Sequence, residues 1–244
     1  LGINPHITVT TVGPVQDYGA LAGKLRGLPH VTEVVPTVEG YVLFTRYGYG
    51  SLLQVRGITE ADLAAKHLVA DHLTAGSIKD FADNKVAIGV RLAERFNLKV
   101  GDQITFISPK FTYTPFGGMP RKGTFEIGMI FNVGMYDVDS SLVAMPLDTA
   151  QQFFQTGQGV SELDVMLDQP EEALDQARRA IADTLGNQYR ILDWKEQNFA
   201  YLNALDTERT TMFIILTLII LVAAFNIVSS LIMLVKDKGA DIAI

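Results

Sequence analysis

Two short segments come closest to a motif that does chemistry: a glycine-containing stretch and a pair of histidines. The stretch 19–24 (GALAGK) resembles a phosphate-binding loop, which holds phosphate oxygens with backbone N–H groups and a lysine. Only three residues separate its glycines, where the motif has four, and Leu25 replaces the Ser or Thr after the lysine. Because the stretch also lies inside a helical pattern of apolar residues, an amphipathic helix is the better interpretation.

Metal and nucleophilic chemistry are no better supported. The histidines are best interpreted as solvated or loop residues: His6, His30, His67 and His72. His67 and His72 are five positions apart, which does not suit one helix face, and there is no HExxH motif. Asp137 and Asp139 lack the ligand spacing of a calcium loop. With no cysteine and no G-x-S-x-G motif, the sequence predicts no enzyme, and neither a metal nor another cofactor.

The composition excludes further classes of protein. Of 244 residues, 48% are hydrophobic and 19% are charged, and the formal net charge is −7. These values exclude a disordered or low-complexity chain. A negatively charged chain also lacks the basic surface that general binding of nucleic acid requires.

One segment indicates a membrane protein. No charged residue lies between Arg209 and Lys236, and the core of the segment reads MFIILTLIILVAAFNIVSSLIMLV (212–235). A helix rises ~1.5 Å per residue, so this one is long enough to cross a hydrocarbon core about 30 Å thick. The alternative is a buried helix of a large soluble core, but no second apolar run could cover it. We therefore predict a transmembrane helix over 211–235.

The residues flanking the span predict its orientation and its packing. Lys236 and Lys238 follow it directly, so the positive-inside rule puts the C-terminal end in the cytoplasm and residues 1–210 outside. Within the span, one helical stripe of small or polar residues predicts packing against another helix, rather than a monomeric span: Ala223, Asn226 and Ser230. Segment 236–244 is amphipathic and interrupted by Gly239. It is either a short helix on the cytoplasmic face or a cytoplasmic loop.

The outer part of the chain reads as an α+β domain with two lobes. Strand, helix and strand patterns follow one another at 7–35 and again at 161–194, which predicts a split β-α-β lobe of ferredoxin-like layout. The residues between these units are rich in strand patterns and predict an inserted β-rich lobe. We assign the first lobe to 1–56 and 148–194, the inserted lobe to 57–147, and a helical connector to 195–210.

A long link between two predicted strands is the best candidate for a binding site. Residues 108–124 (SPKFTYTPFGGMPRKGT) join ITFIS and TFEIGMIF, although a tight hairpin needs only about 2–5 loop residues. Its aromatic and methionine side chains cannot all be buried in a protruding segment: Phe111, Tyr113, Phe116 and Met119. Exposed side chains of this kind indicate a partner surface, and Arg121 with Lys122 would favour an acidic rim on that partner. The alternative is a loop folded back on its own lobe.

Several of these segments also resemble one family of membrane proteins. The segments LGINPHITV (1–9), ERTTMFIILTLIILVAAFNIVSSLIMLV (208–235) and KDKGADIAI (236–244) are similar to the lipoprotein-releasing permeases of the LolC/LolE family. That family belongs to a wider group with MacB and FtsX. AIGVRLAERFNLKVGDQITFISP (87–109) and residues 125–154 resemble the periplasmic core of the same group. The resemblance covers essentially the whole chain and is most specific in the span.

The resemblance implies a membrane subunit of an ABC transporter in the bacterial inner membrane, with residues 1–210 in the periplasm. Such a permease is polytopic and non-catalytic, and it contributes to outer membrane biogenesis by extracting lipoprotein cargo from the membrane lipid. The implied partners are a LolD-like ATPase subunit, a second permease subunit (LolE-like or a second copy) and a LolA-like periplasmic carrier. No nucleic acid partner is implied.

The resemblance also assigns roles to particular residues. In the LolC type, a protruding hairpin called the hook recruits the carrier, and 110–123 falls at its place, with these residues: Tyr113, Pro115, Phe116, Gly118, Met119, Pro120, Arg121 and Lys122. Closure of the ATPase would push 236–244 and tilt the span, through Lys236, Lys238, Asp241 and Ile242. Lipid chains would lie against the outer half of the span, at Met212, Phe213, Ile215 and Leu216.

Two other functions remain open from the sequence. A MacB- or FtsX-like mechanotransmission permease would export other cargo or control a cell-wall hydrolase, and the arm at 110–123 argues against it. A single-pass membrane sensor would carry a signalling domain after residue 244 in place of further spans.

Overall fold

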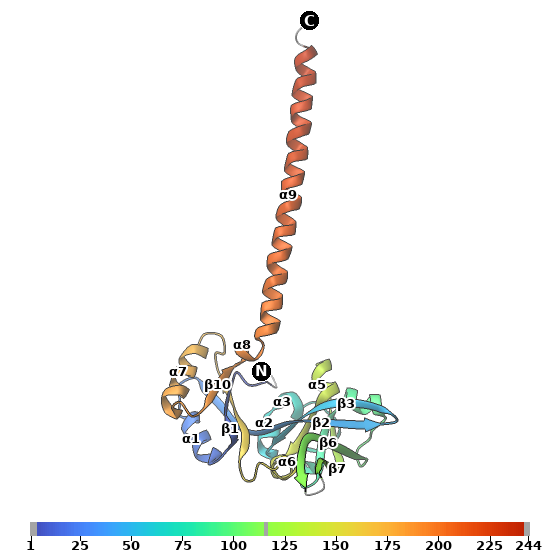
Figure 1. The fold of residues 1–244 in the computed structure, drawn as a ribbon, viewed down its shortest axis with the longest axis vertical. Helices are drawn as coiled ribbons and strands as arrows, with labels where there is room; N and C mark the ends of the chain where they lie inside the picture. Colours follow the sequence, from blue (N-terminus) through green and yellow to red (C-terminus); the bar gives the residue numbers. More distant parts are fainter. Residues whose placement is uncertain (1–3, 115–116, 242–244) are drawn as a thin grey trace. The chain divides into compact units, whose positions relative to one another are not determined.

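The computed structural model describes residues 4–114 and 117–241. The chain divides into two compact units, Leu1–Trp194 and Lys195–Ile244. The first unit contains all the strands, and the second is helical (Figure 1).

The first sheet of the folded unit has a ferredoxin-like strand order. Strands β10 (Arg190–Asp193), β1 (Ile7–Val15), β9 (Val160–Leu167) and β2 (Val31–Arg46) lie side by side in that order, and every pair is antiparallel. Strand β9 therefore lies between β1 and β2, which are the two strands of the first β-α-β unit. This is the split arrangement that the sequence predicts for the two β-α-β segments.

Two helices follow from the apolar spacing and pack on this sheet: α1 (Tyr18–Arg26) and α7 (Leu174–Leu185). On α7 the buried residues recur at helical spacing: Leu174, Ala177, Ile181 and Leu185. Gly186 follows with a positive φ of 70°, a conformation that glycine adopts without the steric cost of a Cβ atom. Together with Ala22 and Leu25 of α1, these side chains belong to the main hydrophobic core.

Strand β2 belongs to both sheets. Its residues 31–37 pair with β9, and its residues 38–46 pair with β3 (Tyr49–Ile58). Beyond β3, the pairing runs through β8 (Leu142–Pro146), β5 (Lys85–Gly89), β7 (Gly117–Phe131) and β6 (Gln103–Thr114). Because β6 pairs with β2 again, these strands form a closed ring, and β4 (Leu73–Gly76) adds to β7 outside it. The lobe boundaries given above stay a prediction.

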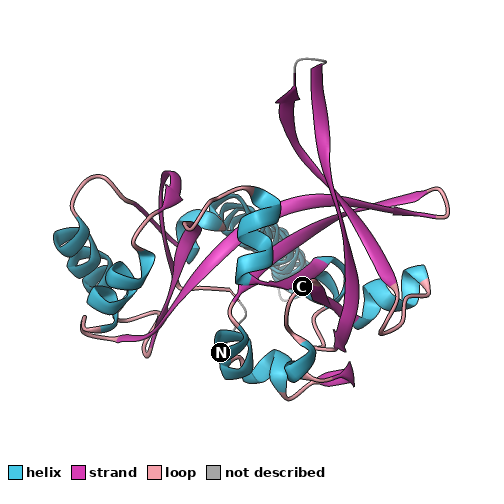
Figure 2. Cartoon of the chain, turned by 90° about the horizontal axis from the view of Figure 1, so that it is seen from below, coloured by secondary structure: helices cyan, strands magenta, loops and turns pink. Residues whose placement is uncertain are grey.

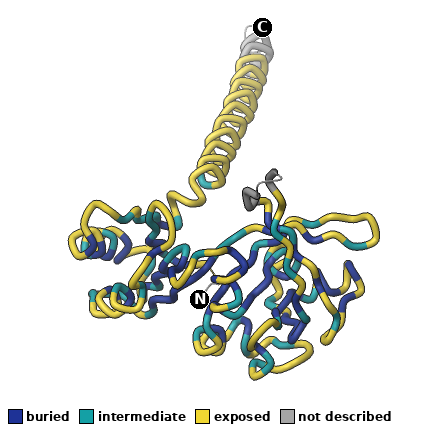
Figure 3. The backbone as a smooth tube through the Cα atoms, turned by 60° about the horizontal axis from the view of Figure 1, so that its bottom comes forward, coloured by how far each residue is buried: buried dark blue, intermediate teal, exposed yellow. Residues whose placement is uncertain are grey.

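Short helices cover this ring. They are α2 (Glu60–Ala65), α3 (His67–Ala70), the 3-10 helix η1 (Ile78–Asp80), α4 (Val90–Phe96), α5 (Tyr136–Ser141) and α6 (Leu147–Phe154). Two glycines let α6 approach β2 and β3 closely, since a Cβ at Gly40 would overlap the Phe154 ring and one at Gly57 would overlap Ala150. Alternate residues of β5 and β8 lie in two different hydrophobic clusters, so both faces of these strands are buried. Figure 3 shows buried backbone running through both parts of the unit.

The link predicted at 108–124 is a paired hairpin and not an irregular loop. Backbone pairing joins Phe111 to Pro120, Thr112 to Met119, Tyr113 to Gly118 and Thr114 to Gly117. Residues with high strand propensity at 111–114 continue β6 outward, and the register shifts between Ile107 and Phe111, where Pro109 has no N–H to donate. In Figure 2 this hairpin and the β2–β3 hairpin are the two long projections from the sheet.

The second unit is a single long helix after a short one. Helix α8 (Trp194–Gln197) is followed by α9 (Phe199–Asp241), which has 43 residues. At ~1.5 Å per residue, α9 is about 65 Å long, roughly twice the thickness of a hydrocarbon core. Its segment Phe199–Leu234 contains an 18-residue stretch with a mean hydropathy of 2.7 and is long and apolar enough to cross a membrane. The expected interruption at Gly239 is wrong, because one glycine costs a helix only about 1 kcal/mol.

Candidate functional site

The arm, residues 110–123, projects from the closed ring with its base well fixed. Near the base, the Thr105 and Thr124 hydroxyl groups lie 2.9 Å apart, and the Asn84 amide donates to the Thr124 carbonyl at 2.8 Å. A Cβ at Gly123 would meet the rings of Phe125 and Phe153 at 2.8 Å, so glycine allows the strand to approach these rings. The arm is therefore held at its root by side-chain contacts in addition to backbone pairing.

The predicted hook residues differ in where they lie. Met119 is 61% exposed, and Pro120 and Lys122 are exposed. Tyr113 and Gly118 lie opposite each other in the paired strands, while Pro115 and Phe116 fall outside the described residues. The exposed members are compatible with a partner surface, whose role in binding stays a prediction.

Arg121 contacts the protein's own body. Its Nη1 donates to the Phe153 carbonyl at 2.5 Å, and its Nε is buried. Phe153 is in the last turn of α6, where carbonyl groups have no partner within the helix. Arg121 thus satisfies a helix-end carbonyl and anchors the arm, a role that the sequence alone does not predict.

The predicted residues of α9 all lie on one uninterrupted helix. The positions Ala223, Asn226 and Ser230 share a face by their spacing, and Met212, Phe213, Ile215 and Leu216 are exposed within the folded chain. Lys236, Lys238 and Asp241 lie in the helix, and Ile242 lies outside the described residues. Their assignments to helix packing, lipid contact and ATPase coupling stay predictions.

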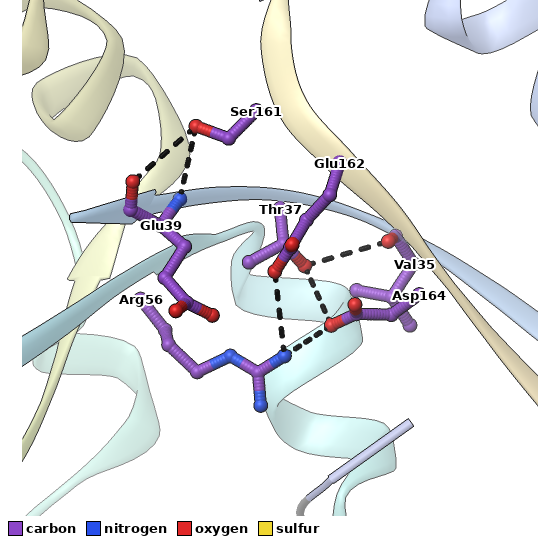
Figure 4. Close-up of polar contacts among 7 residues, drawn as sticks. All are labelled: Val35, Thr37, Glu39, Arg56, Ser161, Glu162 and Asp164. Carbon is purple, nitrogen blue, oxygen red and sulfur yellow. Dashed lines mark hydrogen bonds and ion pairs between the residues drawn. The ribbon is translucent and has the colours of Figure 1, made fainter. Parts of the chain in front are cut away.

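A buried charge cluster at the junction of the two sheets is a feature that the sequence analysis missed. Arg56 of β3 forms an ion pair with Asp164 of β9 and lies 4.0 Å from Glu162 of the same strand. The Thr37 hydroxyl of β2 donates to Asp164 at 3.1 Å. Figure 4 shows Arg56 and the carboxyl groups of Glu39, Glu162 and Asp164 converging. Alternation in 161–168 predicts Asp164 on a polar face, but in the structure Asp164 is 2% exposed and lines a small cavity with Leu63 of α2 and Val69 of α3.

Burial changes the acidity of this cluster. Desolvation, followed by the nearby charges of Asp164 and Glu39, raises the pKa of Glu162 to about 9. Burial also raises the pKa of Asp164, against the opposing effects of Arg56, Lys66 and the Thr37 hydroxyl. Glu162 therefore holds a proton at neutral pH.

The histidines have separate structural surroundings. His6 Nδ1 accepts from the Leu167 N–H at 2.9 Å, and burial lowers the pKa of His6. His30 lies 3.1 Å from Asp168, and the exposed His67 lies 3.3 Å from Asp71 one helical turn later. Within 4–114 and 117–241, no three His, Asp or Glu side chains are placed to hold a metal ion.

One open groove lies between α1, α7 and the end of β1. It has a volume of about 810 Å³, and its lining includes Gln16, Asp17, Lys24, Gln188 and Tyr189. The lysine of the GALAGK stretch thus lies on a helix at the wall of a shallow polar groove. The stretch 19–24 is therefore part of the amphipathic helix α1, as predicted, and not a phosphate-binding loop.

A family match over most of the folded domain defines the class of the protein. Residues 4–184 match the MacB-like periplasmic core domain, and the chain belongs to that family. The apolar helix indicates a membrane protein. Together with the periplasmic core domain, it places the chain in the inner membrane with its folded domain in the periplasm.

Within that class, the chain is similar to lipoprotein-releasing proteins along its whole length. It is 32% identical over 247 residues to the lipoprotein-releasing system transmembrane protein LolC of Neisseria meningitidis, with 100% of this chain and 60% of that protein covered. Identity to LolE of Haemophilus influenzae is 26% over 253 residues, with 100% and 60% covered. The chain thus spans about 60% of the length of these curated relatives.

Solved structures of similar proteins include the periplasmic region of MacB from Actinobacillus actinomycetemcomitans. That structure has a TM-score of 0.49 and 14% identity, with 83% of this chain and 94% of that chain covered. The extracellular domain of the transporter YknZ from Gram-positive bacteria has a TM-score of 0.47 and 16% identity, with 77% and 99% covered.

Proposed function

We propose that this chain is part of a permease subunit of an ABC transporter that releases lipoproteins from the inner membrane and transfers them to a periplasmic carrier. The observation that carries the proposal is the 32% identity to LolC along the entire chain, from the first strand through the apolar helix. The geometry is consistent with it, because the described residues present a projecting arm.

The arm would be the carrier-binding element. A two-stranded hairpin is stiff along its strands and presents alternate side chains to opposite faces, so it can enter a groove on a partner with little loss of entropy. Met119, Pro120 and Lys122 are exposed on it, and Tyr113, Pro115, Phe116 and Gly118 complete the proposed surface. Arg121 would contribute by holding the base of the hairpin on α6.

The helical unit would transmit work from ATP hydrolysis. A LolD-like ATPase subunit would act on residues 236–244, including Lys236, Lys238, Asp241 and Ile242. An uninterrupted helix resists bending, so a push at one end of α9 would reach the other end without an intervening hinge. A second permease subunit, LolE-like or a second copy, would pack against Ala223, Asn226 and Ser230. Lipid chains of the cargo would contact Met212, Phe213, Ile215 and Leu216.

The test of the arm is binding of a LolA-type carrier to the full chain in detergent. Deleting 111–122 should abolish binding while circular dichroism shows the fold retained. A matched control is available in the other projecting hairpin, whose tip carries Tyr47 at 73% and Tyr49 at 69% exposure. Replacing both tyrosines with Ser should leave carrier binding unchanged. Equal binding by the deletion variant and the parent chain would refute the assignment.

The match to the MacB-like domain supports a second candidate, a mechanotransmission permease for other cargo or for control of a cell-wall hydrolase. The two candidates differ in what leaves the membrane. The first requires that labelled lipoprotein appear in the soluble fraction with the carrier, whereas the second requires that lipoprotein stay in the membrane while another substrate is exported or a hydrolase is activated.

A further inference from the structure

The buried charge cluster lies where strand β2 passes from one sheet to the other. Thr37 is the last residue of β2 paired with β9, and Val38 is the first paired with β3. On one face of the sheet, Glu39 stands opposite Arg56, Thr37 opposite Glu162, and Val35 opposite Asp164. The cluster therefore spans three strands on a single face, directly over the junction.

Side chains alone join β3 to β9 at this point. No backbone pairing between these two strands occurs in the described part of the chain, and the Arg56–Asp164 ion pair reaches across β2 to connect them. On the neighbouring strand pair, the Ser161 hydroxyl of β9 accepts from the Glu39 N–H of β2 at 3.2 Å and donates to the Glu39 carbonyl at 3.4 Å. These polar contacts lie at the junction, beside the hydrophobic core that both sheets share.

The charges in the cluster are unequal. The carboxyl groups of Glu39, Glu162 and Asp164 surround the guanidinium of Arg56, and Glu162 hydrogen-bonds Glu39. Asp164 Oδ1 is buried and has no hydrogen-bond partner within 4–114 and 117–241. Two neighbouring carboxyl groups in a buried site share one proton at low cost, whereas two carboxylates repel each other strongly.

The other titratable groups facing the cluster do not remove this imbalance. Lys66, between α2 and α3, lines a cavity of about 20 Å³ with Arg56 and Asp164. Asp137 of α5 lines a second cavity, of about 160 Å³, with Arg56. Tyr41 follows Glu39 on the same face of β2, and its pKa is raised by burial and by the charges of Glu39 and Glu162. The cluster is therefore faced by one further cation, Lys66, and by two further acidic groups, the Asp137 carboxyl and the Tyr41 hydroxyl.

We propose that Arg56 and the three carboxyl groups around it form a proton-dependent latch between the two sheets. The latch is closed while Glu162 holds its proton and hydrogen-bonds Glu39. When Glu162 ionises, its carboxylate faces those of its partly buried and buried neighbours around Arg56, and the repulsion favours separation of β3 from β9 and entry of water. Closure fixes the angle between the sheet that carries α1 and α7 and the ring that carries the arm. The latch needs no carrier and no cargo, so it is independent of the proposed function.

Spin labels on either side of the junction test the latch. The chain has no cysteine, so Gln176→Cys on α7 and Glu94→Cys on α4 introduce the only two, both at exposed positions. Pulsed electron paramagnetic resonance on the full chain in detergent would compare about pH 6 with about pH 10, on either side of the Glu162 pKa of about 9. We expect one narrow distance distribution at the lower pH and a second population at the higher pH.

Variants assign that change to the proton of Glu162. Glu162→Gln keeps the shape of the side chain and cannot ionise, so it should show the narrow distribution at both pH values. Glu33→Gln, on the same strand β2 and outside the cluster, should respond like the parent chain. A single distribution for the parent chain at high pH, or a second population that persists in Glu162→Gln, would overturn the latch. If circular dichroism shows Glu162→Gln unfolded at the lower pH, Glu39→Gln replaces it with the same expected result.

Discussion

At the scale of single residues, Glu162 and Arg121 are polar side chains whose roles depend on burial. The Glu162 side chain is 15% exposed, and desolvation, followed by the charges of neighbouring carboxylates, raises its pKa so that it retains its proton. Arg121 uses its guanidinium to complete the end of a helix. Each gives a prediction that separates its role from that of an ordinary surface charge.

The raised pKa of Glu162 predicts how stability depends on pH. An unfolded Glu titrates near 4.5 and folded Glu162 near 9, so between these values the folded protein holds a proton that the unfolded chain releases. The free energy of unfolding should therefore fall as the pH rises through this interval, by up to about 1.4 kcal/mol per pH unit, and level off above it. Urea denaturation of the full chain at a series of pH values measures the slope. Glu162→Gln should flatten it, and an equal slope in the variant would contradict the assignment.

Arg121 and its neighbour Lys122 should respond differently to replacement by alanine. Arg121→Ala leaves the Phe153 carbonyl without its donor and should lower the free energy of unfolding by about 1–2 kcal/mol. Lys122 is exposed, so Lys122→Ala should change stability by no more than about 0.5 kcal/mol. Denaturation of the two variants side by side checks the difference. Equal losses would show that the hydrogen bond to α6 contributes nothing.

At the scale of elements, glycines in β2 and β3 determine how closely α6 packs on these two strands. Gly57→Ala would place its Cβ against Ala150 and 3.3 Å from the Val38 Cβ. Overpacking of this kind should destabilise the domain by about 1–3 kcal/mol. Gly23→Ala, within α1, meets no atom within 4 Å and should stabilise its helix by up to about 1 kcal/mol. Thermal unfolding would test the pair, and a stabilised Gly57→Ala would contradict the packing of α6.

The polar stripe on α9 predicts association of the span with another helix. Asn226→Leu removes the amide that could hydrogen-bond across a helix pair and should weaken association by about 1 kcal/mol. Phe225→Leu, on the adjacent position, should leave it unchanged. Energy transfer between labelled full chains in lipid vesicles measures association. Equal transfer in the parent chain and in Asn226→Leu would exclude this face as the contact between copies.

Elements with a clear period were predictable from the sequence, and long-range pairing was not. Alternation at 7–12 and the stripe from Leu174 to Leu185 were sufficient for β1 and α7, because local patterns determine which face is buried. The closed ring depends on β6 pairing with β2, which no local pattern specifies. The length and composition of 108–124 mark it as unusual, and the family resemblance places a hairpin there, but no local pattern gives the register of its strands out to Thr114. The charge cluster was missed because its members are far apart in the sequence.

At the scale of the whole molecule, the chain joins a periplasmic domain to an uninterrupted apolar helix. Strand β10 ends at Asp193, α8 begins at the next residue, and α9 then runs to Asp241. The central proposal is that this chain, within its permease, would convert work done by an ATPase in the cytoplasm into the handover of lipoprotein outside. Such a role requires both the arm and the continuous helix, and it requires no chemistry within the chain itself.

The most direct test is lipoprotein transfer by the complete transporter, with this chain in its full-length permease, reconstituted in vesicles with labelled lipoprotein, ATP and carrier. The account predicts ATP-dependent appearance of lipoprotein in the soluble fraction with the carrier. Deleting 111–122 should abolish this transfer while ATP hydrolysis continues. Transfer that survives the deletion, or vesicles that retain all their lipoprotein while hydrolysing ATP with the arm intact, would contradict it.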